Sequence, residues 1–404
     1  MSKAKVAIIL TVLVDVIGIG IVIPSLPFYV LDFGVGAATI TTLFAVFSLC
    51  SFFSTPVLGV LSDRYGRRPI LIASIFSTAL GWLMFALAPS IIWLFIGRII
   101  DGLAAGNIST AHSVITDLSV DDKDRTHNLG VLGAVFGIGF IIGPAIGGLL
   151  GSAHPHAPFW FVTILATLNL LFVYFFLPET NKHLADKFGL VWWQQIHPLR
   201  PVIAAAKNKI LRPLYSVWFL FSLALATQQS VMALYLLQIF NVGIAGTGWL
   251  MAGVGVGIAL NQGVGLKHFW LKKFAEPDLQ LWLLLVMFIA FIFLSLPAGI
   301  YFIVGMILNI ICQSVLRVVM TSQMVGAAPL NGRGEVIGVL NSIMSLGMVA
   351  GPLIAGALFN IKPALPFWLA AGFMFLAFIT VLCQRKKISL VPTVETPETN
   401  MIMD

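Results

Sequence analysis

Runs of about 20 apolar residues recur along the whole of this 404-residue chain and constrain its fold more than any other feature. A helix of this length crosses the hydrocarbon core of a bilayer, where every backbone group must be hydrogen-bonded within the protein. The composition agrees, with 59% hydrophobic residues and only 10% charged ones. We therefore predict an all-α membrane protein. The twelve expected transmembrane helices lie at 6–30, 39–62, 69–88, 91–114, 127–151, 158–177, 211–238, 246–264, 279–296, 299–322, 335–359 and 364–384.

The basic residues follow the positive-inside rule. Of the 23 Lys and Arg residues, all but Arg98, Arg317 and Lys362 lie at the termini, around the long central connection, or in alternate short connections. This distribution predicts that both termini are cytoplasmic. Because the basic residues lie at the cytoplasmic membrane surface, the net charge of +7 does not indicate binding to nucleic acid. The partners that we expect are a small-molecule substrate, protons and the lipid bilayer.

The two halves of the chain are related to each other. Residues 125–160 match residues 333–368 without a gap, and Gly143-Pro144 aligns with Gly351-Pro352. This repeat predicts two six-helix bundles related by an axis along the membrane normal, with the substrate between them. The expected parts are an N-terminal bundle at 1–180, a cytoplasmic central loop at 181–210, a C-terminal bundle at 211–387 and a disordered cytoplasmic tail at 388–404.

Asp15 is the only charged residue between Val6 and Val30. A carboxylate at membrane depth costs about 2.5–3.5 kcal/mol on insertion scales, so such a group usually has a function. Because burial disfavours the charged form of a carboxylate, we expect Asp15 to bind and release protons. A structural Asp, protonated or paired with Arg, is the alternative. Arg98 and Asp101 lie three residues apart on one helix and are expected to pair, with Asp101 as a second candidate proton carrier.

The sequence between the second and third spans carries a motif, Gly59-Val-Leu-Ser-Asp63-Arg64-Tyr-Gly66-Arg67-Arg68. It resembles the loop signature of the major facilitator superfamily. The resemblance implies a conformational latch, in which Asp63 faces the start of the eleventh span and Arg67 pairs with Asp117. Ordinary surface salt bridges are the alternative, since exposed pairs contribute little. The implied latch residues are Gly59, Asp63, Arg64, Gly66, Arg67, Arg68, Asp117 and Glu335.

A glycine-rich motif in the fifth span resembles the one that marks the drug:proton antiporter branch of this superfamily. Its members are Gly139, Gly143, Pro144, Gly147 and Gly148. The stretch from Asp15 to Pro27, with His156–Phe159 and Leu177–Glu179, is similar to bacterial tetracycline-efflux antiporters. The resemblance implies a proton-driven exporter in a bacterial cytoplasmic membrane.

The chain departs from those exporters at two places. They carry an acidic residue in the third span, where this chain has Gly81, and another in the ninth, where 279–296 holds none. The resemblance ties both acids to the metal–tetracycline complex and to proton coupling. We therefore expect a substrate other than tetracycline.

Uncharged polar residues at membrane depth are candidates for the wall of a substrate cavity, although some of them will only join helices. Arg317 could bind an anionic substrate or pair with Glu335. The cavity candidates are Asn107, Gln228, Gln229, Asn261, Asn309, Gln313 and Arg317.

The function that we predict is proton-coupled export of a small organic molecule, either a drug or an endogenous metabolite such as a siderophore, by alternating access. One alternative is a proton-coupled symporter that imports a small anionic or zwitterionic nutrient, and another is a non-transporting membrane sensor or scaffold. The sequence shows no nucleophile–base pair, metal-ligand cluster or phosphate-binding loop, so we expect no enzyme activity, no cofactor and no metal. We expect a monomer.

Overall fold

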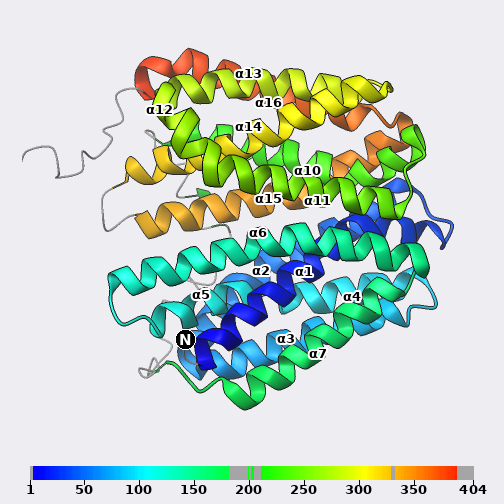
Figure 1. Cartoon of the computed structure of the whole chain (residues 1–404), viewed down its shortest axis with the longest axis vertical. Helices are drawn as coiled ribbons and strands as arrows, with labels where there is room; N and C mark the ends of the chain where they lie inside the picture. The colour runs from blue at the N-terminus through cyan, green and yellow to red at the C-terminus, as the bar shows by residue number, and fades with distance from the viewer. Residues whose placement is uncertain (1–2, 182–198, 200–201, 204–210, 329–332, 389–404) are drawn as a thin grey trace, which may run out of the picture. The chain divides into compact units, whose positions relative to one another are not determined.

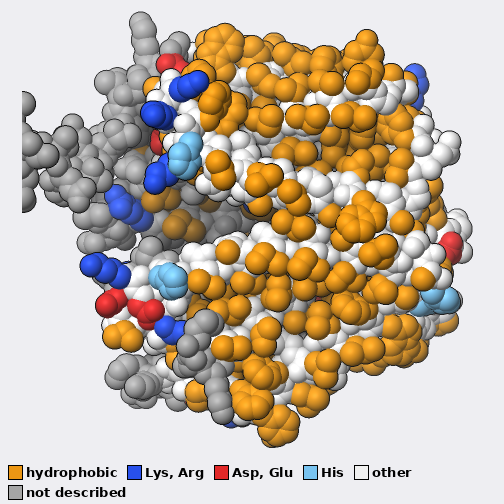
Figure 2. Space-filling model, viewed as in Figure 1, with side chains coloured by type: hydrophobic (Ala, Val, Ile, Leu, Met, Phe, Trp, Pro, Cys, Tyr) orange, Lys and Arg blue, Asp and Glu red, His pale blue; other side chains and the backbone are white. Residues whose placement is uncertain are grey.

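The computed structural model describes residues 3–181, 199, 202–203, 211–328 and 333–388. Within them are 12 helices long and apolar enough to cross a membrane, so the predicted number of transmembrane helices is confirmed. The expected tail at 388–404, beyond its first residue, and most of the expected central loop lie outside the described residues. On the face drawn in Figure 2, apolar side chains cover the lengths of the helices, while charged side chains lie at helix ends. This pattern is what a lipid-embedded chain requires.

The described elements are all helical (Figure 1). Their bounds are α1 Lys3–Leu31, α2 Ala37–Tyr65, α3 Arg67–Ala86, α4 Ile91–Leu103, α5 Asn107–Asp117, α6 Asp122–Ala153, α7 Ala157–Phe176, α10 Arg212–Phe240, α11 Ile244–Leu260, η1 Asn261–Trp270, α12 Leu271–Lys273, α13 Glu276–Ser295, α14 Gly299–Gly326, α15 Arg333–Ile361 and α16 Leu365–Ile388.

Several helix starts follow from local sequence. The side chain of Asp121 accepts a hydrogen bond from the backbone N–H of Asp124 at 2.7 Å and so caps α6. At the start of α13, Glu276 and Asp278 place negative charge beside the positive end of the helix dipole. Proline stands near the start of both α7 and α13, where its missing N–H costs nothing.

The chain folds into two compact units. One comprises Met1–Pro198, Leu225–Ala259 and Met348–Pro366, and the other comprises Leu199–Ala224, Leu260–Gly347 and Phe367–Asp404. The expected division into two six-helix bundles at the central loop stays a prediction.

Helix α1 is the centre of packing in the first unit, where it lies along α6 and α7 and also contacts α5 (Figure 1). An apolar cluster fills the space among these helices and α3. Its buried members are Ala4, Ile8, Val12, Val16, Leu71, Ile75, Ala111, Val114, Ile115, Leu132, Val135, Val173 and Leu177. Asp15 lies between two of them in sequence, so the apolar core fixes the position of the helix that carries the acid.

The sequence repeat reappears as a repeated helix contact. A Cβ at Gly143 of α6 would meet the backbone of Gly20 of α1 at 2.8 Å. At the corresponding place in the second half, a Cβ at Gly351 of α15 would meet Ala226 of α10 at 2.8 Å. In both cases the absence of a side chain lets two helices approach closely in lipid.

Candidate functional site

Asp15 lies in the middle of α1, half-buried, and faces a side chain of α5. Its Oδ1 accepts a hydrogen bond from Nδ2 of Asn107 at 3.2 Å. Its Oδ2 is buried and has no hydrogen-bond partner among the described residues. A carboxylate oxygen in this situation lacks the donors that stabilise a full negative charge, so the site suits a group that takes up a proton.

A break in the fourth span positions Asn107. The predicted span at 91–114 is present at Ile91–Asp117. It consists of two helices, since α4 ends at Leu103 and α5 begins at Asn107. Between them, Gly106 lies against Leu58 of α2, where an added Cβ would come within 2.7 Å of the leucine side chain. Asn107 is therefore the first residue of a new helix and is 5% exposed.

The same amide links Asp15 to a second acid. Nδ2 of Asn107 also donates to Oγ1 of Thr78 on α3 at 3.3 Å, and the Thr78 hydroxyl lies near the carboxylate of Asp101 on α4. Asp101 is 8% exposed and its Cβ lies against Gly81, where an added Cβ would come within 3.0 Å of it. A side chain at position 81 would therefore crowd Asp101 and the carbonyl oxygen of Gly97.

Arg98 pairs loosely with Asp101 and is enclosed by aromatic rings. Its Nη1 lies 3.7 Å from Oδ2 of Asp101. Its guanidinium carbon is 4.8 Å from the ring centroids of Trp82 and Phe85 and 5.5 Å from that of Phe47. Its Nε and Nη2 are buried without partners within the described part of the chain. The cation is thus held mainly by π faces and by one distant carboxylate.

The glycine-rich motif of α6 has two faces. Added Cβ atoms at Gly139, Gly143 and Gly147 would meet residues of α1, in the segment that follows Asp15. A Cβ at Gly148 would instead meet Gly248 of α11 at 2.9 Å, and Gly248 also lies against the carbonyl oxygen of Pro144. The motif therefore packs α6 closely against the acid-bearing helix on one side and against α11 on the other.

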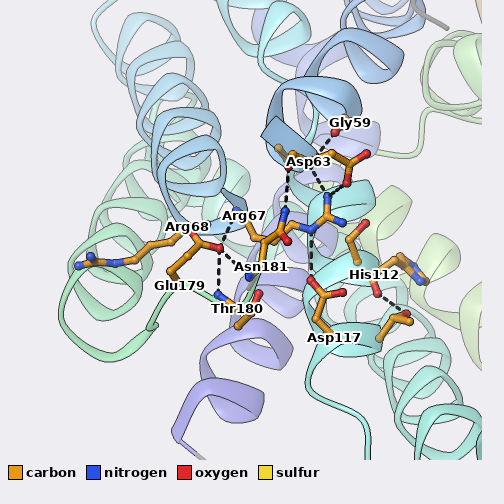
Figure 3. A network of polar contacts seen from close by, with 12 residues as sticks. Gly59, Asp63, Arg67, Arg68, His112, Asp117, Glu179, Thr180 and Asn181 are labelled. Atoms are coloured by element: carbon orange, nitrogen blue, oxygen red, sulfur yellow. Dashed lines mark hydrogen bonds and ion pairs between the residues drawn. The ribbon is translucent and has the colours of Figure 1, made fainter. Parts of the chain in front are cut away.

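The predicted pair between Arg67 and Asp117 forms at one end of the first unit (Figure 3). Nε of Arg67 lies 3.2 Å from Oδ2 of Asp117, and Nη1 lies 2.5 Å from Oδ1 of Asp63. Nη1 also donates to Oγ of Ser62 at 2.7 Å. Arg67 thus joins the end of α2 to the end of α5. The expected approach of Asp63 to the start of the eleventh span near Glu335 stays a prediction.

Glu179 completes this end of the unit, and the sequence reasoning gave it no role. Its carboxylate accepts hydrogen bonds from the backbone N–H groups of Arg67 at 2.9 Å and Arg68 at 3.1 Å, which begin α3 (Figure 3). It also accepts from the N–H groups of Thr180 and Asn181, each at 2.9 Å. The signal was present in Leu177-Pro178-Glu179, which ends the sixth span.

Gly66 is required by this arrangement. Its φ of 100° lies in the region that favours glycine, and a side chain there would collide with the carboxylate of Glu179. The segment after α7 is therefore anchored directly to the motif between α2 and α3. Of the other motif residues, Gly59 has open space beside it, Arg64 lies over the Tyr65 ring at 5.2 Å, and Arg68 donates to the carbonyl oxygen of Tyr174 at 2.7 Å.

Replacing Glu179 by alanine should destabilise the protein by about 1–2 kcal/mol, because four backbone N–H groups and the positive end of α3 lose their acceptor. Thr180→Val is a matched control, since the Thr180 hydroxyl is buried without a partner among the described residues. The measurement is the free energy of unfolding of each variant in detergent. Equal stability of Glu179→Ala and the control would contradict the anchoring role.

The remaining polar residues that were predicted for the cavity wall lie in different environments. Asn261 joins helices, because its amide donates to Oγ of Ser314 at 2.6 Å and accepts from Nε1 of Trp270 at 2.9 Å. Asn309 is 1% exposed, with a buried Nδ2 that has no partner in the described ranges. Arg317 is exposed, and the predicted pair with Glu335 is absent from the described ion pairs. Gln228 is buried, Gln229 is exposed and Gln313 is half-buried.

Comparison with known proteins shows which family this chain matches. The family model described as the Major Facilitator Superfamily matches residues 8–300 and 214–398. The class D tetracycline resistance protein of Salmonella ordonez is 30% identical over 89% of this chain and 90% of its own length. The class C protein of Escherichia coli is 38% identical, but the match covers only 45% of this chain and 46% of that protein.

More distant similarities cover nearly the whole chain. The quinolone resistance protein NorA of Staphylococcus aureus is 26% identical over 96% of this chain and 97% of its own length. The structure of the human organic anion transporter MFSD10 superposes with a TM-score of 0.70 over 94% of this chain and 99% of its own, at 23% identity. The nucleoside transporter NupG gives a TM-score of 0.79 at 13% identity, covering 94% of this chain and 99% of its own. At these identities the structures share the fold.

Proposed function

Because the chain belongs to the major facilitator superfamily, we propose that it is a proton-coupled transporter that exports a small organic molecule by alternating access. The observation that carries the proposal is Asp15, a carboxylate on a membrane-spanning helix that has one hydrogen bond and one buried oxygen without a partner among the described residues. Such a group can exchange a proton, because burial favours its neutral form while the hydrogen bond from Asn107 still stabilises the carboxylate.

The path from this acid to the latch runs through α5. The helix begins at Asn107, which binds Asp15, and ends at Asp117, which binds Arg67. Its 11 residues span about 15 Å. When Asp15 gains or loses a proton, its hydrogen bonding with the Asn107 amide changes, and a small shift of α5 moves the carboxylate that holds Arg67. Protonation and opening of the latch then become coupled, as alternating access requires.

The proposed cargo is a drug or an endogenous metabolite such as a siderophore. The relatives named for tetracycline and quinolone resistance support export of organic molecules of that size. Position 81 is a glycine in contact with Asp101, which favours a substrate other than a metal–tetracycline complex. The exposed Arg317 is available to a carboxylate or another anionic group of the substrate. We place the protein in a bacterial cytoplasmic membrane with both termini in the cytoplasm.

The test uses the full chain in proteoliposomes of known orientation, with an acidic lumen and a pH-sensitive dye inside. The probes are tetracycline, a fluoroquinolone and a catecholate siderophore. In inside-out vesicles, an exported probe should accumulate in the lumen and raise the luminal pH, because protons leave in exchange. The importer is tested in right-side-out vesicles with the gradient reversed, so that the exterior is acidic. Accumulation of the probe only there, with protons entering alongside it, would support the importer instead.

A further inference from the structure

Asp15 and Asn107 face each other with an incomplete set of hydrogen bonds. Nδ2 of Asn107 donates to Oδ1 of Asp15 at 3.2 Å. The other oxygen of each group, Oδ2 of Asp15 and Oδ1 of Asn107, is buried and has no partner in the described part of the chain. Both groups therefore have one atom paired and one atom unpaired, and the unpaired atoms are both oxygens.

A single proton would satisfy both unpaired atoms. An ionised carboxylate only accepts hydrogen bonds, and the oxygen of an amide does the same, so neither oxygen can donate to the other. Once Oδ2 of Asp15 carries a proton, it becomes a donor and the Asn107 oxygen is the acceptor on the facing group. A carboxylic acid and a primary amide then form two parallel hydrogen bonds. Buried polar atoms are rarely left unpaired, so this arrangement favours the proton-bearing form.

We infer that Asn107 is a positioning residue that recognises protonated Asp15 through a paired acid–amide contact and registers the loss of the proton by a change in that contact. This inference rests on the proposed function, in which Asp15 carries the proton. It adds Asn107 as a residue whose hydrogen bonds change with the protonation state of Asp15.

The second N–H of the Asn107 amide connects the contact with Asp15 to Thr78. It donates to Oγ1 of Thr78 at 3.3 Å, so the hydroxyl hydrogen of Thr78 is left for another acceptor, and the carboxylate of Asp101 lies nearby. The other charged groups at this site within the described residues are Asp101 and its partner Arg98, both on α4. A rotation of the Asn107 amide upon deprotonation of Asp15 therefore alters the donor to Thr78, which lies near Asp101.

A swap of the two groups tests the inference. Asn107→Asp places a second carboxylate against Asp15, and such a pair holds a proton more tightly, so the pH optimum of transport should rise by at least about 1 unit. The double variant Asp15→Asn with Asn107→Asp restores one acid and one amide. It should transport at least about tenfold faster than Asp15→Asn alone under the same pH gradient.

A spectroscopic measurement reports on the contact directly. In infrared difference spectra of the full chain in lipid, the carbonyl stretch of protonated Asp15 should move to higher frequency in Asn107→Leu, which removes both hydrogen bonds. Thr110→Val is the matched control on α5, because the Thr110 hydroxyl is buried without a partner among the described residues. The control should leave both the band and the pH profile of transport unchanged.

The outcomes separate this inference from the proposed function. If Asp15→Asn keeps full proton coupling, Asp15 is not the proton carrier, and both that part of the proposed function and this inference fail. If Asp15→Asn is inactive but the swap gives no rescue and Asn107→Leu leaves the infrared band in place, the role of Asn107 is wrong while the proposed function stands. If the swapped protein does not fold, the infrared band of Asn107→Leu decides alone.

Discussion

Replacing Asp15 by asparagine should reduce transport driven by a pH gradient to the level of empty liposomes. The side chain keeps its size and can still receive a hydrogen bond from Asn107, which now binds it at 3.2 Å. It can no longer exchange a proton in the physiological range. Facilitated movement of the substrate down its own concentration gradient should remain, because α1 and its packing against α6 are preserved. The measurement is uptake of the probe with and without an imposed pH gradient.

The control for this prediction is Asp32→Asn. Asp32 is the next acid along the chain, just past the end of α1, and it is exposed. Its replacement should leave gradient-driven transport unchanged. Both variants should retain the free energy of unfolding to within about 1 kcal/mol, since neither removes apolar packing. Gradient-driven uptake by Asp15→Asn at the wild-type rate would show that the proton travels on another group, and Asp101 would be the next to examine.

The membrane fold and the acid in α1 could be predicted from the sequence, because both depend on local composition. A helix in lipid must satisfy its own backbone groups, so a long apolar run specifies its structure without reference to the rest of the chain. The interruption of the fourth span at residues 104–106 was not predicted. At that place Gly106 approaches Leu58, and the two positions lie far apart in sequence. The pattern of apolar residues does not predict that contact.

The partners of the charged residues were harder to predict than the residues themselves. Arg98 and Asp101 are neighbours on one helix, so their pairing follows from helical spacing. The contact of Asp15 with Asn107 joins two helices and appears only in the folded chain. Asn107 was therefore predicted as part of a cavity wall, whereas the structure shows it bound to the acid. Glu179 had no predicted role for the same reason, since the backbone groups that it caps belong to another segment.

Replacing Gly143 by leucine should abolish transport and lower the free energy of unfolding by about 3 kcal/mol or more. An added Cβ at this position would lie 2.8 Å from Cα of Gly20 and 2.8 Å from the carbonyl oxygen of Ile17. Both are backbone atoms of α1, so no rotamer change can relieve the collision and α6 must move away. The shift would displace the helix that carries Asp15 from its contact with α5. Proton-coupled transport and the free energy of unfolding should therefore both decrease.

Gly137→Leu is the matched control, because it lies on the same helix and nothing stands within 4 Å of its added Cβ. Leucine forms helix more readily than glycine, so this variant should be as stable as the wild type or slightly more stable. Unfolding of both variants in detergent, with uptake measured in parallel, gives the comparison. If Gly143→Leu were as stable and as active as Gly137→Leu, the close approach of α6 to α1 would not hold in the membrane. The glycines of the motif would then need another explanation, for instance through the opposite face of α6, where Gly148 meets Gly248.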